Sequence, residues 1–131
     1  MNTIRLLAPV ALFAALSAAG CSSARDVEVT GEVKSASSTQ GKIFVEFFDV
    51  AGEGEELELT SVHSVELDQL GTFAEKVPLE GDRVIVRAIA DADGNGACTE
   101  GEAWAEMEAA IEEDAASVAL DISVQACPAA E

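Results

Sequence analysis

The stretch RVIVRAIA, residues 83–90, decides the fold. Apolar side chains recur at every second position of this stretch, at Val84, Val86, Ala88 and Ala90. A period of two places them on one face of a β-strand, whereas an α-helix needs a period near 3.6. Gly81 and Asp82, directly before the stretch, are typical turn residues. We therefore predict a strand over 83–90 that follows a turn and carries these four residues on one face.

Five other segments show strand patterns. The most β-prone is 43–48, Ile-Phe-Val-Glu-Phe-Phe, which we expect to be a central strand. The complete set besides 83–90 is 27–33, 43–48, 57–67, 71–78 and 118–125. Six short strands separated by Gly, Pro and polar turns predict an all-β fold. The expected architecture is a single antiparallel β-sandwich of the prealbumin or immunoglobulin type.

Residues 102–116 allow two interpretations. Their Ala and Glu content favours a helix, with Trp104, Met107 and Ile111 on one face. Apolar residues and glutamates also alternate here at period two, which is typical of a strand. We favour a strand, because a sandwich needs one here to bring the chain back, and expect Glu112–Asp114 to form the hairpin turn.

The first twenty residues have the pattern of an export signal. A short polar start with one positive charge, Arg5, precedes the apolar run Leu6–Ala19 and a small-residue cleavage zone. The run is shorter than the roughly 20 apolar residues that a membrane-spanning helix needs. We expect a signal peptide over 1–20, a tether over 21–26 and a β-sandwich domain over 27–131.

Ala-Ala-Gly-Cys at 18–21 resembles the lipobox of bacterial lipoproteins. The resemblance implies that Cys21 is diacylated and becomes the N-terminus. No Asp follows Cys21, which by the same resemblance implies a lipid anchor in the outer membrane. Cleavage after Ala19 by ordinary signal peptidase is the alternative, and it would give a soluble periplasmic or secreted protein.

The charge balance is strongly acidic, with 25 acidic residues against seven basic ones and a formal net charge of −18. Such a surface repels nucleic acid and anionic lipid headgroups, which need basic patches. It is compatible with divalent cations, with a basic protein partner, or with solubility alone. We therefore expect no nucleic-acid partner.

The runs LGTF at 70–73 and VPLEGDRVIVRA at 77–88 resemble transthyretin-like and collagen-adhesin B-type modules. Those modules have G-x-F, V-P and G-x-Y-x-V-x-A elements over two strands of a prealbumin-like sandwich. Val84 replaces their usual aromatic residue, and their Gly-Gly turn is absent. The resemblance implies a sandwich that serves as a spacer or accessory domain, and it implies no activity.

Residues 91–102, DADGNGACTEGE, match the calcium-loop pattern D-x-[DN]-x-[DN]-G-x5-E without a mismatch. Calcium takes six to eight oxygen ligands, and this spacing wraps them around one point. The expected ligands are side-chain oxygens of Asp91, Asp93 and Asn95, the backbone carbonyl of Ala97, Thr99 through its hydroxyl or a water, and both carboxylate oxygens of Glu102. The preceding segment is a strand rather than the helix of an EF-hand. The alternative is a plain hairpin turn at 93–96.

Three cysteines suggest one disulfide and one lipid site. If Cys21 is lipidated, Cys98 and Cys127 remain as a pair in an oxidising compartment. Neither His63, the only histidine, nor Trp104 lies in a catalytic motif, so we expect a surface residue and a packing residue.

We accordingly expect a non-enzymatic, lipid-anchored cell-envelope protein with a structural Ca²⁺ loop. It would act as a surface adaptor or accessory module, joined to the membrane through Cys21. The alternative function is a metal-free acidic protein that binds a basic protein or peptide.

Overall fold

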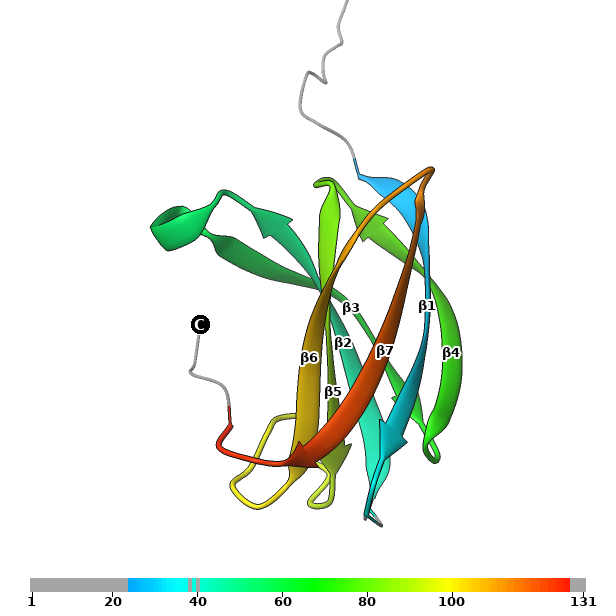
Figure 1. Ribbon diagram of the computed structural model, residues 1–131, viewed down its shortest axis with the longest axis vertical. Helices are drawn as coiled ribbons and strands as arrows, with labels where there is room; N and C mark the ends of the chain where they lie inside the picture. The colour runs from blue at the N-terminus through cyan, green and yellow to red at the C-terminus, as the bar shows by residue number, and fades with distance from the viewer. Residues whose placement is uncertain (1–23, 38, 40, 128–131) are drawn as a thin grey trace, which may run out of the picture.

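The alternating segments form seven strands in the computed structural model, which describes residues 24–37, 39 and 41–127 (Figure 1). The strands are β1 (Arg25–Ser35), β2 (Lys42–Ala51), β3 (Glu58–Leu67), β4 (Gly71–Leu79), β5 (Arg83–Asp91), β6 (Ala103–Ala110) and β7 (Ala115–Val124). One 3-10 turn, η1 (Gly54–Glu56), lies at the tip of the β2–β3 hairpin. The described part of the chain has no α-helix, and the all-β prediction is confirmed.

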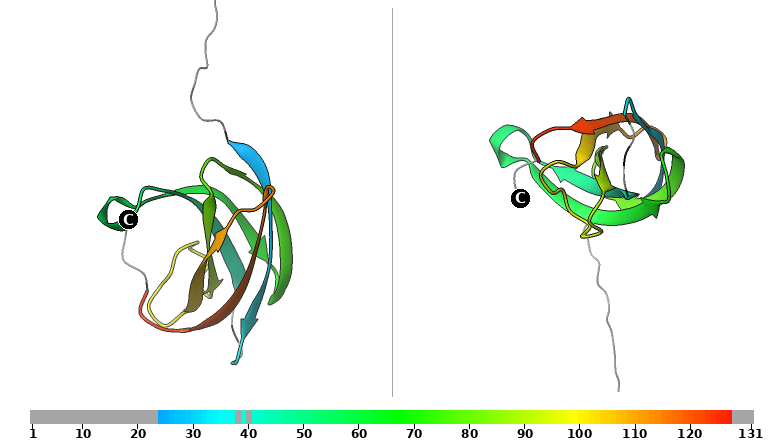
Figure 2. Two further views of the ribbon diagram at one scale, coloured as in Figure 1. Left: turned by 45° about the horizontal axis from the view of Figure 1, so that its top comes forward. Right: turned by 90° about the horizontal axis from the view of Figure 1, so that it is seen from below.

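The strands form one nearly closed sheet in the order β3-β2-β5-β6-β7-β1-β4. Seen from below, the strands surround a common core (Figure 2, right). Neighbouring strands are antiparallel except β1 and β7, which are parallel, so the sheet is mixed. The alternating pattern shows which side chains share a face of a strand, but it does not show which strands are neighbours. It therefore could not indicate that β1 pairs with β7.

β6 resolves the ambiguity over 102–116 in favour of a strand. Ala103 is buried, and Ala105 and Ala109 pack against the main core, which is the period-two face expected of a strand. Met107, which both a helix and the period-two face would bury, is 43% exposed and does not separate the two interpretations. The small residues suit a strand that crosses close to the core, so packing overrides their helical propensity.

The core contains the face predicted from the sequence. Val84, Val86, Ala88 and Ala90 are all buried in the main cluster. Phe47 is fully buried and meets Phe73 edge to face, with ring centroids 5.8 Å apart. A second, smaller cluster forms from Phe48, Val50 and Ile85, with Leu59 packed against it. The Arg87 guanidinium lies 4.8 Å from the centre of the Phe48 ring.

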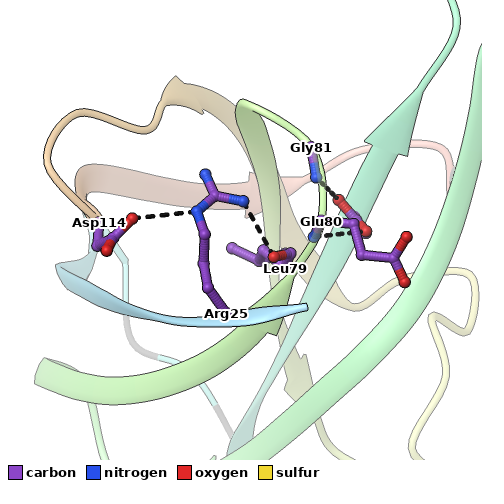
Figure 3. A network of polar contacts seen from close by, with 6 residues as sticks. Arg25, Leu79, Glu80, Gly81 and Asp114 are labelled. Carbon is purple, nitrogen blue, oxygen red and sulfur yellow. Dashed lines mark hydrogen bonds and ion pairs between the residues drawn. The ribbon is translucent and has the colours of Figure 1, made fainter. Parts of the chain in front are cut away.

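The β6–β7 hairpin contains the two positive-φ residues other than glycine in the described part of the chain, Glu113 (φ 54°) and Asp114 (φ 59°). Two adjacent residues of this kind fit a two-residue hairpin turn, in which Asn-Gly is favoured. Asp114 accepts a hydrogen bond from Arg25 Nε at 3.0 Å, and Arg25 also donates to the Leu79 carbonyl at 3.1 Å (Figure 3). Arg25 thus ties the start of β1 to the strained turn and to the end of β4.

Replacing Glu113 by glycine should stabilise the protein by about 1 kcal/mol, because glycine adopts positive φ without a steric penalty. Thermal unfolding followed by circular dichroism should show a melting temperature several degrees higher. Asp114→Gly is the matched control. It relieves the same kind of strain but removes the carboxylate that Arg25 binds, so its melting temperature should rise less than that of Glu113→Gly. An unchanged or lower melting temperature for Glu113→Gly would show that the turn is not strained.

Candidate metal centre

The loop between β5 and β6 lies at the lower end of the sheet in Figure 1. Asp91 is the last residue of β5, and Glu102 directly precedes β6. Because these strands are paired antiparallel neighbours, the two ends of the loop are held close together. Gly96 has a φ of 73°, which glycine tolerates better than other residues.

Three carboxylates of the predicted site converge in this loop. One oxygen each of Asp91, Asp93 and Glu102 lies within 4.8 Å of the others. Asp91 is 4% exposed and Glu102 is 8% exposed, whereas Asp93 is exposed. The motif thus brings its first, third and twelfth positions together.

The two buried carboxylates accept hydrogen bonds from backbone N–H groups of the loop. Asp91 Oδ2 accepts from Gly96 N at 2.7 Å, and its Oδ1 accepts from Asn95 N at 3.2 Å. Glu102 Oε1 accepts from Thr99 N at 2.8 Å, and Oε2 accepts from Ala92 N at 2.8 Å. These bonds hold both carboxylates in place. The same bonds also suit a metal-free acidic turn.

The exposed half of the loop is joined by side chains. Thr99 Oγ1 donates to Asp93 Oδ2 at 2.8 Å and accepts from Asn95 Nδ2 at 3.0 Å. The hydrogen bond from Thr99 is the main cause that holds the pKa of Asp93 below its ordinary value. Asp93 therefore stabilises the loop at neutral pH and loses this contribution as the pH falls through its lowered pKa.

The remaining predicted ligand, Ala97, is exposed, and its N–H donates to Asn95 Oδ1 at 3.0 Å. Asn95 and Thr99 are thus linked directly to the acidic triad, and Ala97 is linked to it through Asn95. All six predicted positions lie in one connected loop.

A disulfide joins Cys98 of this loop to Cys127 after β7, with Cα atoms 5.7 Å apart. This is the pair that the sequence suggested. Trp104 is half-buried, and its indole Nε1 donates to the Ala126 carbonyl at 2.9 Å. Cys21 and the expected signal over 1–20 lie outside the described residues.

His63 differs from the expectation of an isolated surface residue. It is half-buried, its Nε2 lies 2.9 Å from Glu75 Oε1, and its ring centroid lies 5.5 Å from that of Phe47. The pair joins β3 to β4, the two edges of the sheet. Nothing in the local pattern around His63 indicates this partner, because the contact depends on how the sheet curls.

A hollow of about 310 Å³ opens beside the loop. Its lining consists of Ser37, Thr39, Ala90, Ala92, Gly101, Glu102, Ala103 and Val124. Glu102 is the only carboxylate among them, and backbone N–H groups already bind both of its oxygens.

Comparison with protein-family models and with curated proteins gives no match to this chain. Within the described residues, no helix is long and apolar enough to cross a membrane.

Proposed function

We propose that this chain is a non-enzymatic, lipid-anchored cell-envelope protein whose loop 91–102 holds a structural Ca²⁺ ion, and that it serves as a surface adaptor or accessory module. The observation behind the metal site is the convergence of Asp91, Asp93 and Glu102, whose oxygens lie within 4.8 Å of one another. Hard calcium prefers such oxygen donors, and carboxylates are its commonest charged ligands.

The donor set supports calcium over thiophilic metals. The predicted ligands are all oxygens, and the one sulfur in the loop, that of Cys98, is committed to a disulfide. A divalent cation would also reduce the repulsion among three carboxylates that share one loop. Asn95, Thr99 and the Ala97 carbonyl complete the proposed set.

The direct test is calorimetric titration of chelator-treated protein with Ca²⁺ and, separately, with Mg²⁺. We expect a single Ca²⁺ site with a Kd of the order of 10⁻⁴ to 10⁻³ M, as in extracellular modules. Mg²⁺ should bind more weakly, because its strict octahedral demand suits a wrapped twelve-residue loop less well. An absence of Ca²⁺ binding at millimolar concentration would overturn the proposed site.

The position of the loop supports display away from a membrane. Arg25 begins β1 at the upper end of the sheet in Figure 1, whereas the β5–β6 loop lies at the lower end. A lipid on Cys21 would therefore tether the upper end and leave the loop facing outward. The resemblance of 70–73 and 77–88 to transthyretin-like and collagen-adhesin B-type modules favours such an accessory role, since these runs correspond to β4 and β5.

The anchor is tested by Cys21→Ser, which removes the only proposed lipid site. In the native cell, the wild type should sediment with the outer membrane, whereas the variant should lose its membrane association. Intact-mass analysis of the wild type should show acyl chains on Cys21. A mature wild-type protein without lipid would instead support the soluble periplasmic or secreted alternative.

A second candidate, a metal-free acidic protein that binds a basic protein or peptide, is favoured by the β2–β3 hairpin. Its tip projects from the sheet, and four glutamates there are exposed: Glu53, Glu55, Glu56 and Glu58 (Figure 2, left). Binding that depends on these charges should weaken steeply with ionic strength. A partner captured from the native envelope whose affinity does not change with salt would argue against this candidate.

A further inference from the structure

The disulfide enters the proposed calcium loop between two of its ligand positions. Cys98 lies between Ala97, whose carbonyl is a predicted ligand, and Thr99, whose hydroxyl is another. Because the disulfide is attached inside the loop, at Cys98, it restrains the backbone next to both of these ligand positions.

The other half of the disulfide is firmly held. The tail next to Cys127 is bound to Trp104, because Trp104 Nε1 donates to the Ala126 carbonyl and Gln125 Nε2 donates to the Trp104 carbonyl at 2.8 Å. Trp104 lies two residues after Glu102, at the start of β6. The disulfide therefore fixes Cys98 relative to the residue that closes the calcium loop.

Hydrogen bonds also restrain this half of the loop. Thr99 Oγ1 donates to Asp93 Oδ2 and accepts from Asn95 Nδ2, and Ala97 N donates to Asn95 Oδ1. Ala97, Thr99, Glu100 and Gly101 are all exposed. Glu102 N donates to the Thr99 carbonyl at 3.0 Å, and Thr99 N donates to Glu102 at 2.8 Å. Gly101 has a φ of 98°, and glycine leaves the backbone many other conformations when it is released. The disulfide is the covalent restraint on this exposed half of the loop and adds to these hydrogen bonds.

We propose that the Cys98–Cys127 disulfide sets the cation affinity of the loop, so that reduction weakens Ca²⁺ binding and bound Ca²⁺ protects the disulfide. This inference rests on the proposed Ca²⁺ site. When Ca²⁺ binds the reduced protein, residues 97–101 lose conformational entropy, and this loss weakens binding. In the oxidised protein the disulfide has already ordered these residues, so the loss is smaller. Linkage is reciprocal, so Ca²⁺ shifts the disulfide equilibrium by the same factor as the disulfide shifts Ca²⁺ affinity.

The redox step is a two-electron thiol–disulfide exchange. A dithiol such as dithiothreitol gives up two electrons and two protons, the Cys98–Cys127 bond breaks to give two thiols, and the dithiol closes to a cyclic disulfide. The same exchange with a cellular dithiol protein would make the affinity of the loop depend on the redox state of its compartment.

The first measurement uses the wild-type protein. It is equilibrated in buffers of graded ratios of reduced to oxidised dithiothreitol, with Ca²⁺, with Mg²⁺ or with chelator, and free thiols are trapped and counted by mass. Saturating Ca²⁺ should shift the disulfide equilibrium about tenfold toward the oxidised form, equivalent to about 30 mV. An equilibrium that is identical in Ca²⁺ and in chelator would overturn the proposal.

The second measurement compares Ca²⁺ affinity in the oxidised wild type and in Cys98→Ser/Cys127→Ser. We expect the Kd to rise about tenfold in the double variant. The fluorescence of Trp104, the only tryptophan, and circular dichroism show whether the variant remains folded. Arg25→Gln is the control, since it weakens the opposite end of the sheet and should leave the Kd unchanged.

The outcomes separate this inference from the proposed function. Equal Ca²⁺ affinity in wild type and double variant would overturn the role of the disulfide and leave the calcium loop intact. No binding to the oxidised wild type would overturn both. If the double variant does not fold, the disulfide equilibrium of the wild type decides the question alone.

Discussion

Calcium should raise the melting temperature of the oxidised protein by roughly 10 °C relative to protein in chelator. A ligand that binds only the folded state at 100 times its Kd adds about 2.7 kcal/mol to the free energy of unfolding. For a domain of this size each kcal/mol corresponds to several degrees. With a Kd near 10⁻⁴ M, about 10 mM Ca²⁺ reaches this range. Mg²⁺ at the same concentration should give a smaller shift and also controls for ionic strength.

Glu102→Gln should abolish most of this shift. The substitution removes the charge that closes the proposed site and keeps one carbonyl oxygen, which can accept from the backbone N–H of Ala92 or of Thr99 but not from both. Glu100→Gln is the matched control, because it removes one exposed charge from the same loop outside the acidic triad. It should keep the shift nearly intact.

Differential scanning calorimetry of the three proteins in Ca²⁺, Mg²⁺ and chelator separates the interpretations. Equal melting temperatures of the wild type in Ca²⁺ and in chelator would leave loop 91–102 as an acidic turn. If Glu100→Gln and Glu102→Gln reduce the Ca²⁺-dependent rise in melting temperature equally, net charge rather than a specific binding site causes that rise.

The sequence predicted the faces of the strands well, because side-chain period and burial are directly coupled. Val84, Val86, Ala88 and Ala90 were assigned to one face, and all are buried. Ile85 and Ile89 on the opposite face are buried as well, which the alternation did not indicate. The segment now seen as β6 was harder to assign, since Ala and Glu favour helix locally. The strand was favoured because a sandwich needs one at this point to bring the chain back across the sheet. That argument depends on the whole fold and not on the residues of the segment.

The metal loop was predictable in outline because its spacing is local. Twelve consecutive residues suffice to bring Asp91, Asp93 and Glu102 together, and the structure places these carboxylates near one another. The backbone N–H groups that bind Asp91 and Glu102 follow from the conformation of the loop, and the motif alone does not specify them.

Contacts between distant residues could not be predicted. Arg25 and Asp114 are 89 positions apart and meet only because β1 lies beside β7. His63 and Glu75 meet only because the two edges of the sheet approach each other. A pattern within one segment carries no information about which other segment will lie beside it, so the parallel pairing and both of these contacts needed the structure.

Phe47→Ala should cost about 4 kcal/mol of stability, a large part of the total for a domain of this size. Phe47 is fully buried, meets Phe73 edge to face and lies under the ring of His63. Truncation removes these contacts and leaves a cavity beneath the His63–Glu75 pair that joins the two edge strands. We therefore expect the edges β3 and β4 to lose hydrogen-exchange protection before the rest of the sheet.

Phe44→Ala is the matched control on the same strand. Phe44 lies three residues earlier, on the opposite face, and is only half-buried, so its truncation should cost clearly less. Urea denaturation of both variants, with the disulfide intact, gives the two free energies of unfolding. In the register found here Val45 lies opposite Ala88 of β5, and a shift of this pairing by one residue would exchange the inner and outer positions of Phe47 and Phe44. Equal costs for the two variants would therefore contradict this register and the placement of the core inside the nearly closed sheet.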